Sequence, residues 1–245
     1  VIKMDCKNNL IIKKIFLDWD EVKDLNVYPF NIESIKNFKE INFDKPVTFL
    51  VGDNGIGKST FIEALAVALG LPAEGGTQNF KYETRNTTSE LANYIRIDKY
   101  RNPATKFFLR AESFYNFASE VDDLGIEVSR NYGGSLHTCS HGESFLKLLQ
   151  YRFSDNGLYI LDEPEAALSP QHQLSLLCLI NDLVKNGSQF IIATHSPILM
   201  AYPDAEIFVI DDNEIVKTPY KKTDNYMITR KFLENPEKMM DYLFE

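Results

Sequence analysis

The chain has 245 residues, enough for one large domain or two small ones, and its formal net charge of −9 argues against a large non-specific DNA-binding surface. Its three cysteines, Cys6, Cys139 and Cys178, are too few for a disulfide framework and suit a reducing compartment. No run approaches the roughly 20 apolar residues of a membrane span, and the first residues lack a signal-peptide pattern. We therefore expect a cytoplasmic protein that does not insert into a membrane.

The predicted elements alternate between strands and helices. Apolar runs at 11–17 and 47–51 predict two strands, and helical spacing at 59–69, stopped by Gly70 and Pro72, predicts a helix. Farther along, the same patterns predict a loop with short strands at 73–89, a strand leading into a loop at 106–114, and a mostly helical stretch at 115–156. They also predict strands at 158–164, 188–197 and 205–211, a helix at 170–187, and a helix start at Ser196-Pro197. Because the later strands are continuous apolar runs, we expect an α/β fold with a parallel-rich sheet covered on both faces.

A phosphate-binding loop stands between the strand at 47–51 and the helix at 59–69. Residues 52–59, GDNGIGKS, match G-x-x-x-x-G-K-[ST], in which backbone N–H groups and a helix N-terminus surround an anion. Lys58 is expected to reach the β- and γ-phosphates, Ser59 to be a Mg²⁺ ligand, and Thr60 to contact the α-phosphate side. The predicted phosphate-binding residues of the loop are Asp53, Asn54, Gly55, Ile56, Gly57, Lys58, Ser59 and Thr60.

Two adjacent carboxylates, Asp162 and Glu163, end the apolar run LYIL. Ligands collect at the carboxyl ends of strands in open α/β sheets. We expect Asp162 to hold Mg²⁺ and Glu163 to polarise the attacking water. The run FIIAT delivers His195 to the same edge, where it could sense the γ-phosphate. The alternative is a polar strand end in which these residues only form turns.

The segment CSHGES at 139–144 precedes another apolar run. Ser140 and Glu143 have the spacing of a capping box at a helix start. Gly142 would then lie in the first turn, where glycine costs about 1 kcal/mol relative to alanine. This penalty suggests that the segment has a further purpose.

Three metal-type side chains, His137, Cys139 and His141, also occur here and raise a zinc alternative. A structural zinc site takes four ligands, and no fourth is near in sequence, since His172 and Cys178 are distant. Purified protein without stoichiometric zinc would exclude the idea.

The phosphate loop, SHGES, LYILDEP, ALSP and ATHS occur in this order and together resemble the ABC-type ATPase fold. The opening IESIKNFKEINFDKPVTFLVGDNGIGKST is similar to the RecF and SMC-like branch, and the chain looks like a compact, stand-alone group of bacterial ATPases. The resemblance implies a P-loop NTPase with a mixed sheet, in which 1–245 is a single ABC-type head and about 113–156 is a small helical lobe.

The resemblance further implies a head-to-tail homodimer that encloses two MgATP. Ser140, Gly142 and Glu143 of one subunit would face the phosphate loop of the other, in the place of the family's Leu-Ser-Gly-Gly-Gln signature. The chain departs from that signature, since His141 replaces a Gly and Glu143 the Gln.

Other positions of the family pattern also differ. The D-loop at ALSP lacks its Asp, and no Q-loop glutamine follows the strand at 106–114, where Glu112 or Arg110 stands instead. Glu112 is carried over as a metal contact, and Lys39 lies where the branch often has a nucleotide-touching arginine.

The function that follows is an ATP hydrolase that dimerises on MgATP and switches a protein partner or a DNA-linked process such as repair or defence. The segment between Lys58 and Ser140 is too short to supply long coiled-coil arms besides its share of the head. Two alternatives are the nucleotide-binding subunit of a membrane transporter and a module that holds ATP with little turnover.

Overall fold

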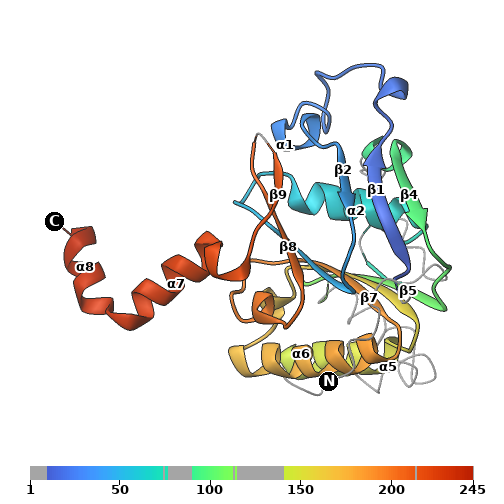
Figure 1. The fold of residues 1–245 in the computed structure, drawn as a ribbon. Coiled ribbons are helices and arrows are strands. Elements are labelled where there is room, and N and C mark those ends of the chain that lie inside the picture. The colour runs from blue at the N-terminus through green and yellow to red at the C-terminus, as the bar shows by residue number, and fades with distance from the viewer. Residues whose placement is uncertain are drawn as a thin grey trace.

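A computed structural model describes residues 10–73, 75–76, 90–112, 114, 141–212 and 214–244. These residues form two sheets with helices on both sides (Figure 1). The strands are β1 (Ile12–Leu17), β2 (Glu40–Asn42), β3 (Val47–Val51), β4 (Ile95–Lys99), β5 (Thr105–Arg110), β6 (Gly157–Asp162), β7 (Gln189–Ala193), β8 (Glu206–Ile210) and β9 (Ile215–Lys217). The α-helices are α1 (Glu33–Lys36), α2 (Lys58–Ala68), α5 (His141–Arg152), α6 (Pro170–Lys185), α7 (Asp224–Glu234) and α8 (Pro236–Phe244).

The larger sheet has the order β5-β6-β7-β3-β8-β9. The first five of these strands are parallel, and β9 pairs antiparallel with β8. β3, β6 and β7 are buried along their whole length, which explains their continuous apolar runs. The expectation of a mixed, parallel-rich α/β sheet is confirmed.

Alternate side chains of the larger sheet enter two separate cores. Leu50, Ile160 and Ile191 pack with α2 and with the smaller antiparallel sheet, β2-β1-β4. Their neighbours Phe49 and Leu161 point to the opposite face and pack with α5 and α6. Figure 1 shows α2 on one side of the sheet and α5 and α6 on the other. The carboxyl ends of the parallel strands therefore lie between two well-covered faces.

Several predicted boundaries change. The strand that was expected to lead into a loop within 106–114 ends at Arg110, where the N–H of Ala111 bonds to the carbonyl of Asp162 and the chain turns. The helical stretch expected through 156 ends at Arg152, and its earlier part, 115–140, lies outside the described residues.

No α-helix starts at Ser196-Pro197, so that prediction is wrong. The Ser196 hydroxyl accepts the N–H groups of Ile198 and Leu199, and the chain forms only a 3₁₀ turn at Leu199–Ala201.

The short strands β2, β4 and β9 were not predicted.

The C-terminal helices α7 and α8 extend from the body of the molecule (Figure 1). Neither contains a buried residue, although both carry exposed apolar side chains, among them Ile228, Leu233 and Phe244. Among the described helices, none is both long enough and apolar enough to cross a membrane.

Candidate functional site

The loop between β3 and α2 curls over the end of the sheet. Gly57 has a φ of 100°, a left-handed conformation that favours glycine, and a Cβ here would lie 3.2 Å from both Ile32 and Ser34. The Ser34 hydroxyl donates to the carbonyl of Ile56, which ties the loop to α1. The sequence pattern thus produces a loop with the close backbone approach that phosphate binding requires.

Lys58 points back under this loop. Its Nζ donates to the carbonyls of Gly52, at 2.7 Å, and Asp53, at 2.8 Å. Burial lowers the pKa of Lys58, while the nearby carboxylates of Glu163 and Asp162 oppose that effect. The ammonium group is therefore held where an anion in the loop would meet it.

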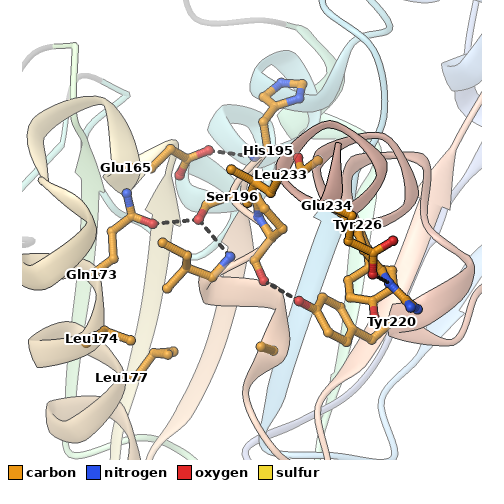
Figure 2. A pocket seen from close by; sticks show the side chains of 15 residues that line it. Glu165, Gln173, Leu174, Leu177, His195, Ser196, Tyr220, Tyr226, Leu233 and Glu234 are labelled. Carbon is orange, nitrogen blue, oxygen red and sulfur yellow. Dashed lines mark hydrogen bonds and ion pairs between the residues drawn. The ribbon is translucent and has the colours of Figure 1, made fainter. Parts of the chain in front are cut away.

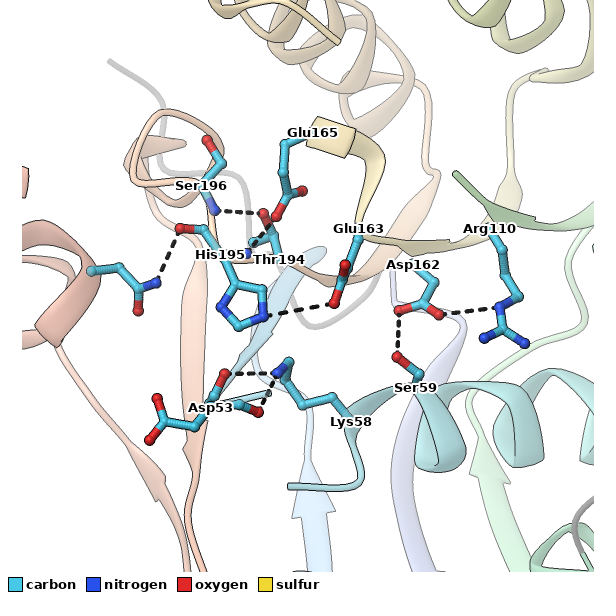
Figure 3. A network of polar contacts seen from close by, with 12 residues as sticks. Asp53, Lys58, Ser59, Arg110, Asp162, Glu163, Glu165, Thr194, His195 and Ser196 are labelled. Atoms are coloured by element: carbon cyan, nitrogen blue, oxygen red, sulfur yellow. Dashed lines mark hydrogen bonds and ion pairs between the residues drawn. The ribbon is translucent and has the colours of Figure 1, made fainter. Parts of the chain in front are cut away.

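Asp162 ends β6 beside the first turn of α2 (Figure 3). Its Oδ1 lies 3.4 Å from the Ser59 hydroxyl and its Oδ2 lies 3.4 Å from Nε of Arg110. The side chain is only 5% exposed. Burial raises the pKa of Asp162 to about 6, and the neighbouring Arg110 guanidinium offsets part of the rise.

The pair Ser59 and Asp162 fits a magnesium ion of the kind that uses few protein ligands. Mg²⁺ commonly takes one or two carboxylates and completes its shell with waters and substrate phosphates. One hydroxyl and one carboxylate oxygen beside a phosphate loop provide that donor set. In the described part of the chain, no group of three or more His, Cys, Asp or Glu side chains could hold a metal by itself.

The zinc alternative at His137, Cys139 and His141 cannot be compared with these contacts. The first two residues, and the side chain of His141, lie outside the described residues.

Glu163 and His195 lie next to Asp162, on adjacent strand ends. β6 and β7 pair in a register that sets Asp162 opposite Ala193, two residues before His195. Glu163 has a φ of 49°, a left-handed conformation that is uncommon for a residue with a side chain. Its Oε1 lies 3.6 Å from Nε2 of His195, and both side chains are partly exposed (Figure 3).

Side-chain hydrogen bonds fix the segment that carries His195 (Figure 2). Glu165 accepts the His195 N–H at 2.5 Å, and Asn225 of α7 donates to the His195 carbonyl at 3.1 Å. The Ser196 hydroxyl donates to Gln173 of α6 at 2.5 Å. These contacts line a groove of about 890 Å³ between α6 and α7. Glu165, which follows the strand-end carboxylates in sequence, thus positions the backbone that carries the histidine.

The structure therefore brings together Lys58, Ser59, Asp162, Glu163 and His195. In the loop, Asp53, Asn54 and Gly55 are exposed, Ile56 and Gly57 are half-buried, and Thr60 lies 3.1 Å from the hydroxyl of Tyr28.

The remaining predicted residues lie elsewhere. Lys39 is exposed between α1 and β2, and Glu112 is 88% exposed, with its Oε2 3.8 Å from Nη2 of Arg110. Glu143 is exposed in the first turn of α5. Ser140 lies outside the described residues, so the proposed capping box is not described.

Gly142 has a packing reason that the sequence did not reveal. A Cβ on this residue would overlap the imidazole ring of His172 in α6 and lie 3.4 Å from the carbonyl of Ala167. Gly142 thus leaves room for the His172 side chain and the D-loop segment beside α5, apart from any contact with a phosphate.

Two further residues at the site were not assigned roles from the sequence. Arg110 contacts Asp162, and Tyr28 contacts Thr60. Arg110 stands at the end of a strand that pairs with 157–162, opposite Asp162. This pairing, and with it the contact to Asp162, can be predicted only when the strand order is known. No pattern around Tyr28 linked it to the loop.

A family model described as "AAA domain" matches residues 30–166, more than half of the chain. A second model, described as "AAA domain, putative AbiEii toxin, Type IV TA system", matches residues 144–201.

Similar proteins share modest identity with the chain. The Hemin import ATP-binding protein HmuV of Nocardia farcinica is 27% identical over 223 residues, which cover 80% of this chain and 74% of that protein. Protein Pixie of Drosophila melanogaster is 26% identical over 214 residues, covering 81% of this chain and 33% of that protein.

Among solved structures, the SMC head domain from Thermotoga maritima aligns with a TM-score of 0.47 and 18% identity, covering 86% of this chain and 99% of that one. From the family match over residues 30–166, the chain belongs to the AAA-domain family, and the proteins similar to it include ATP-binding proteins of ABC transporters.

Proposed function

We propose that the chain binds MgATP at the phosphate loop and hydrolyses it. The observation that carries the proposal is the convergence of Lys58, Ser59, Asp162 and Glu163 at one sheet edge. The loop N–H groups and Lys58 would bind the β- and γ-phosphates. Ser59 and Asp162 would hold Mg²⁺, which neutralises phosphate charge and orients the γ-phosphate for attack.

Glu163 is the proposed general base for the attacking water. Its partial exposure and left-handed backbone direct the carboxylate to the open side of the site, next to His195. His195 would orient the water or the γ-phosphate, and Glu165 would keep its backbone in place. Neither step requires a residue outside the described cluster.

We further propose that 1–245 works as one ABC-type head and that two copies enclose two MgATP head to tail. Gly142 and Glu143 lie in the first turn of α5, and the partial positive charge of a helix N-terminus favours an anion such as a phosphate of the other subunit. Ser140 would join them. ATP held only by the dimer would favour dimerisation by mass action.

The experiment for hydrolysis compares two variants with wild type. Glu163→Gln should bind ATP with nearly unchanged affinity and lose turnover, because only the proposed base is altered. Lys58→Ala should lose both, because it removes the phosphate contact and the ties to Gly52 and Asp53. Undiminished turnover in Lys58→Ala would contradict the site assignment.

Two candidate roles for the chain differ in the kind of partner that it would bind. The RecF/SMC-like opening and the partial match to a toxin–antitoxin model favour a switch for a protein or DNA-linked process such as defence. The likeness to HmuV favours the ATP-binding subunit of an importer instead. Capture with ATP-loaded Glu163→Gln separates them, since an importer subunit would retain an integral membrane protein and the switch would retain a soluble protein or DNA.

A further inference from the structure

One guanidinium group, that of Arg110, faces three carboxylates from three different segments. Its Nε lies 3.4 Å from Oδ2 of Asp162 in β6, its Nη1 donates to Oε2 of Glu63 in α2 at 2.9 Å, and its Nη2 lies 3.8 Å from Oε2 of Glu112. The register of the sheet sets Arg110 directly opposite Asp162. The position of this cation is therefore determined by the strand pairing.

The three contacts differ in strength. Glu63 is 19% exposed and forms the short, charge-assisted bond, whereas the 88% exposed Glu112 adds little because water screens it. Nε of Arg110 is buried and makes no hydrogen bond. Glu63 thus anchors the guanidinium, and Nε, which makes no hydrogen bond, lies 3.4 Å from the metal-site carboxylate of Asp162.

The two oxygens of Asp162 are used differently. Oδ1 faces the Ser59 hydroxyl, the position proposed for the metal, and Oδ2 faces Arg110 (Figure 3). Arg110 and a metal ion would therefore not compete for the same oxygen of Asp162. The positive charge of Arg110 is present at the site before any metal arrives.

We propose that Arg110 is a specificity-determining residue that acts as a built-in counter-cation, allowing the site to accept ATP without bound Mg²⁺. This inference rests on the proposed ATP site. The phosphates of free ATP would otherwise approach two carboxylates, Asp162 and Glu163, with Lys58 as the loop's own cation. Arg110 offsets the charge of Asp162, a task that Mg²⁺ takes over when present.

The test measures ATP affinity by isothermal titration calorimetry, once with excess Mg²⁺ and once with EDTA. Wild-type protein should bind ATP in both. Arg110→Gln should weaken binding in EDTA by on the order of tenfold, because one nearby positive charge is lost, and by less than about threefold with Mg²⁺. Thermodynamic linkage then requires that Mg²⁺ bind the ATP-loaded variant more tightly than ATP-loaded wild type, by the ratio of these two changes.

Two variants serve as controls. Arg110→Lys keeps the charge and should retain binding in EDTA. Arg96→Gln makes the same charge change in β4, where Arg96 pairs with Asp18 and Glu21, and should leave both affinities unchanged.

Equal losses in Mg²⁺ and EDTA, or no loss in either, would overturn the proposal, because a merely structural arginine affects both conditions alike. Wild-type protein that binds ATP only with Mg²⁺ would overturn it without any variant. Wild-type protein that binds ATP in neither condition would instead refute the proposed function.

Discussion

Replacing Asp162 by asparagine should stabilise the nucleotide-free protein at neutral pH. In the folded chain, burial raises the pKa of Asp162 from the ordinary 3.8 to about 6. Above pH 6 the folded protein holds a buried carboxylate that the unfolded chain would hydrate. A difference of about two pKa units corresponds to about 3 kcal/mol, which wild type progressively loses as the pH rises from about 4 through 6. Asp162→Asn removes the charge and avoids that loss.

Urea unfolding monitored from pH 4 to pH 8 measures the effect. The free energy of unfolding of Asp162→Asn should exceed that of wild type by up to about 3 kcal/mol at pH 8, and the difference should vanish near pH 4. Glu112→Gln is the matched control, because its exposed carboxylate should change stability by less than about 0.5 kcal/mol. If Asp162→Asn is less stable than wild type at pH 8, or if the difference does not depend on pH, the reasoning from burial is wrong.

Three further predictions concern the same surroundings. Gly142→Ala should lower the free energy of unfolding by about 1–3 kcal/mol, because its methyl group would overlap His172. Adding His172→Ala should restore most of that loss, as measured by urea unfolding. A Gly142→Ala protein as stable as wild type would contradict the packing explanation. Tyr28→Phe removes the hydroxyl contact to Thr60, a proposed phosphate contact, and should weaken ATP binding about two- to tenfold in a fluorescence titration; an unchanged affinity would refute a role for this contact. Calorimetric MgATP affinity should fall about tenfold per pH unit below pH 6, because Asp162 becomes protonated there, and a constant affinity down to pH 5 would exclude it as a metal ligand.

The part of the site that the sequence predicted is the part that local patterns determine. The loop at 52–59 has a required residue spacing, and it folds between β3 and α2 as expected. Asp162, Glu163 and His195 were located because parallel strands end at one edge, so a polar residue after an apolar run is informative.

The contacts that sequence reasoning missed depend on which strands and helices become neighbours. Arg110 meets Asp162 only because β5 pairs with β6, and Gly142 meets His172 only because α5 packs on α6. The sequence showed that Gly142 is an unfavourable residue for a first helical turn. The packing reason for the glycine, the ring of His172, lies 30 residues away in the sequence. The helix expected after Ser196-Pro197 is only a 3₁₀ turn at Leu199–Ala201, although the Ser196 hydroxyl accepts the N–H groups of Ile198 and Leu199 as a helix N-cap would.

The most direct test of the central claim is the mass of Glu163→Gln in solution, measured by size-exclusion chromatography with light scattering. With saturating MgATP the account predicts a dimer of 28.1 kDa chains that retains one ATP per chain, and a monomer after the nucleotide is removed. Lys58→Ala in the same background should remain monomeric. A Glu163→Gln protein that stays monomeric while fully loaded with MgATP would contradict the head-to-tail arrangement.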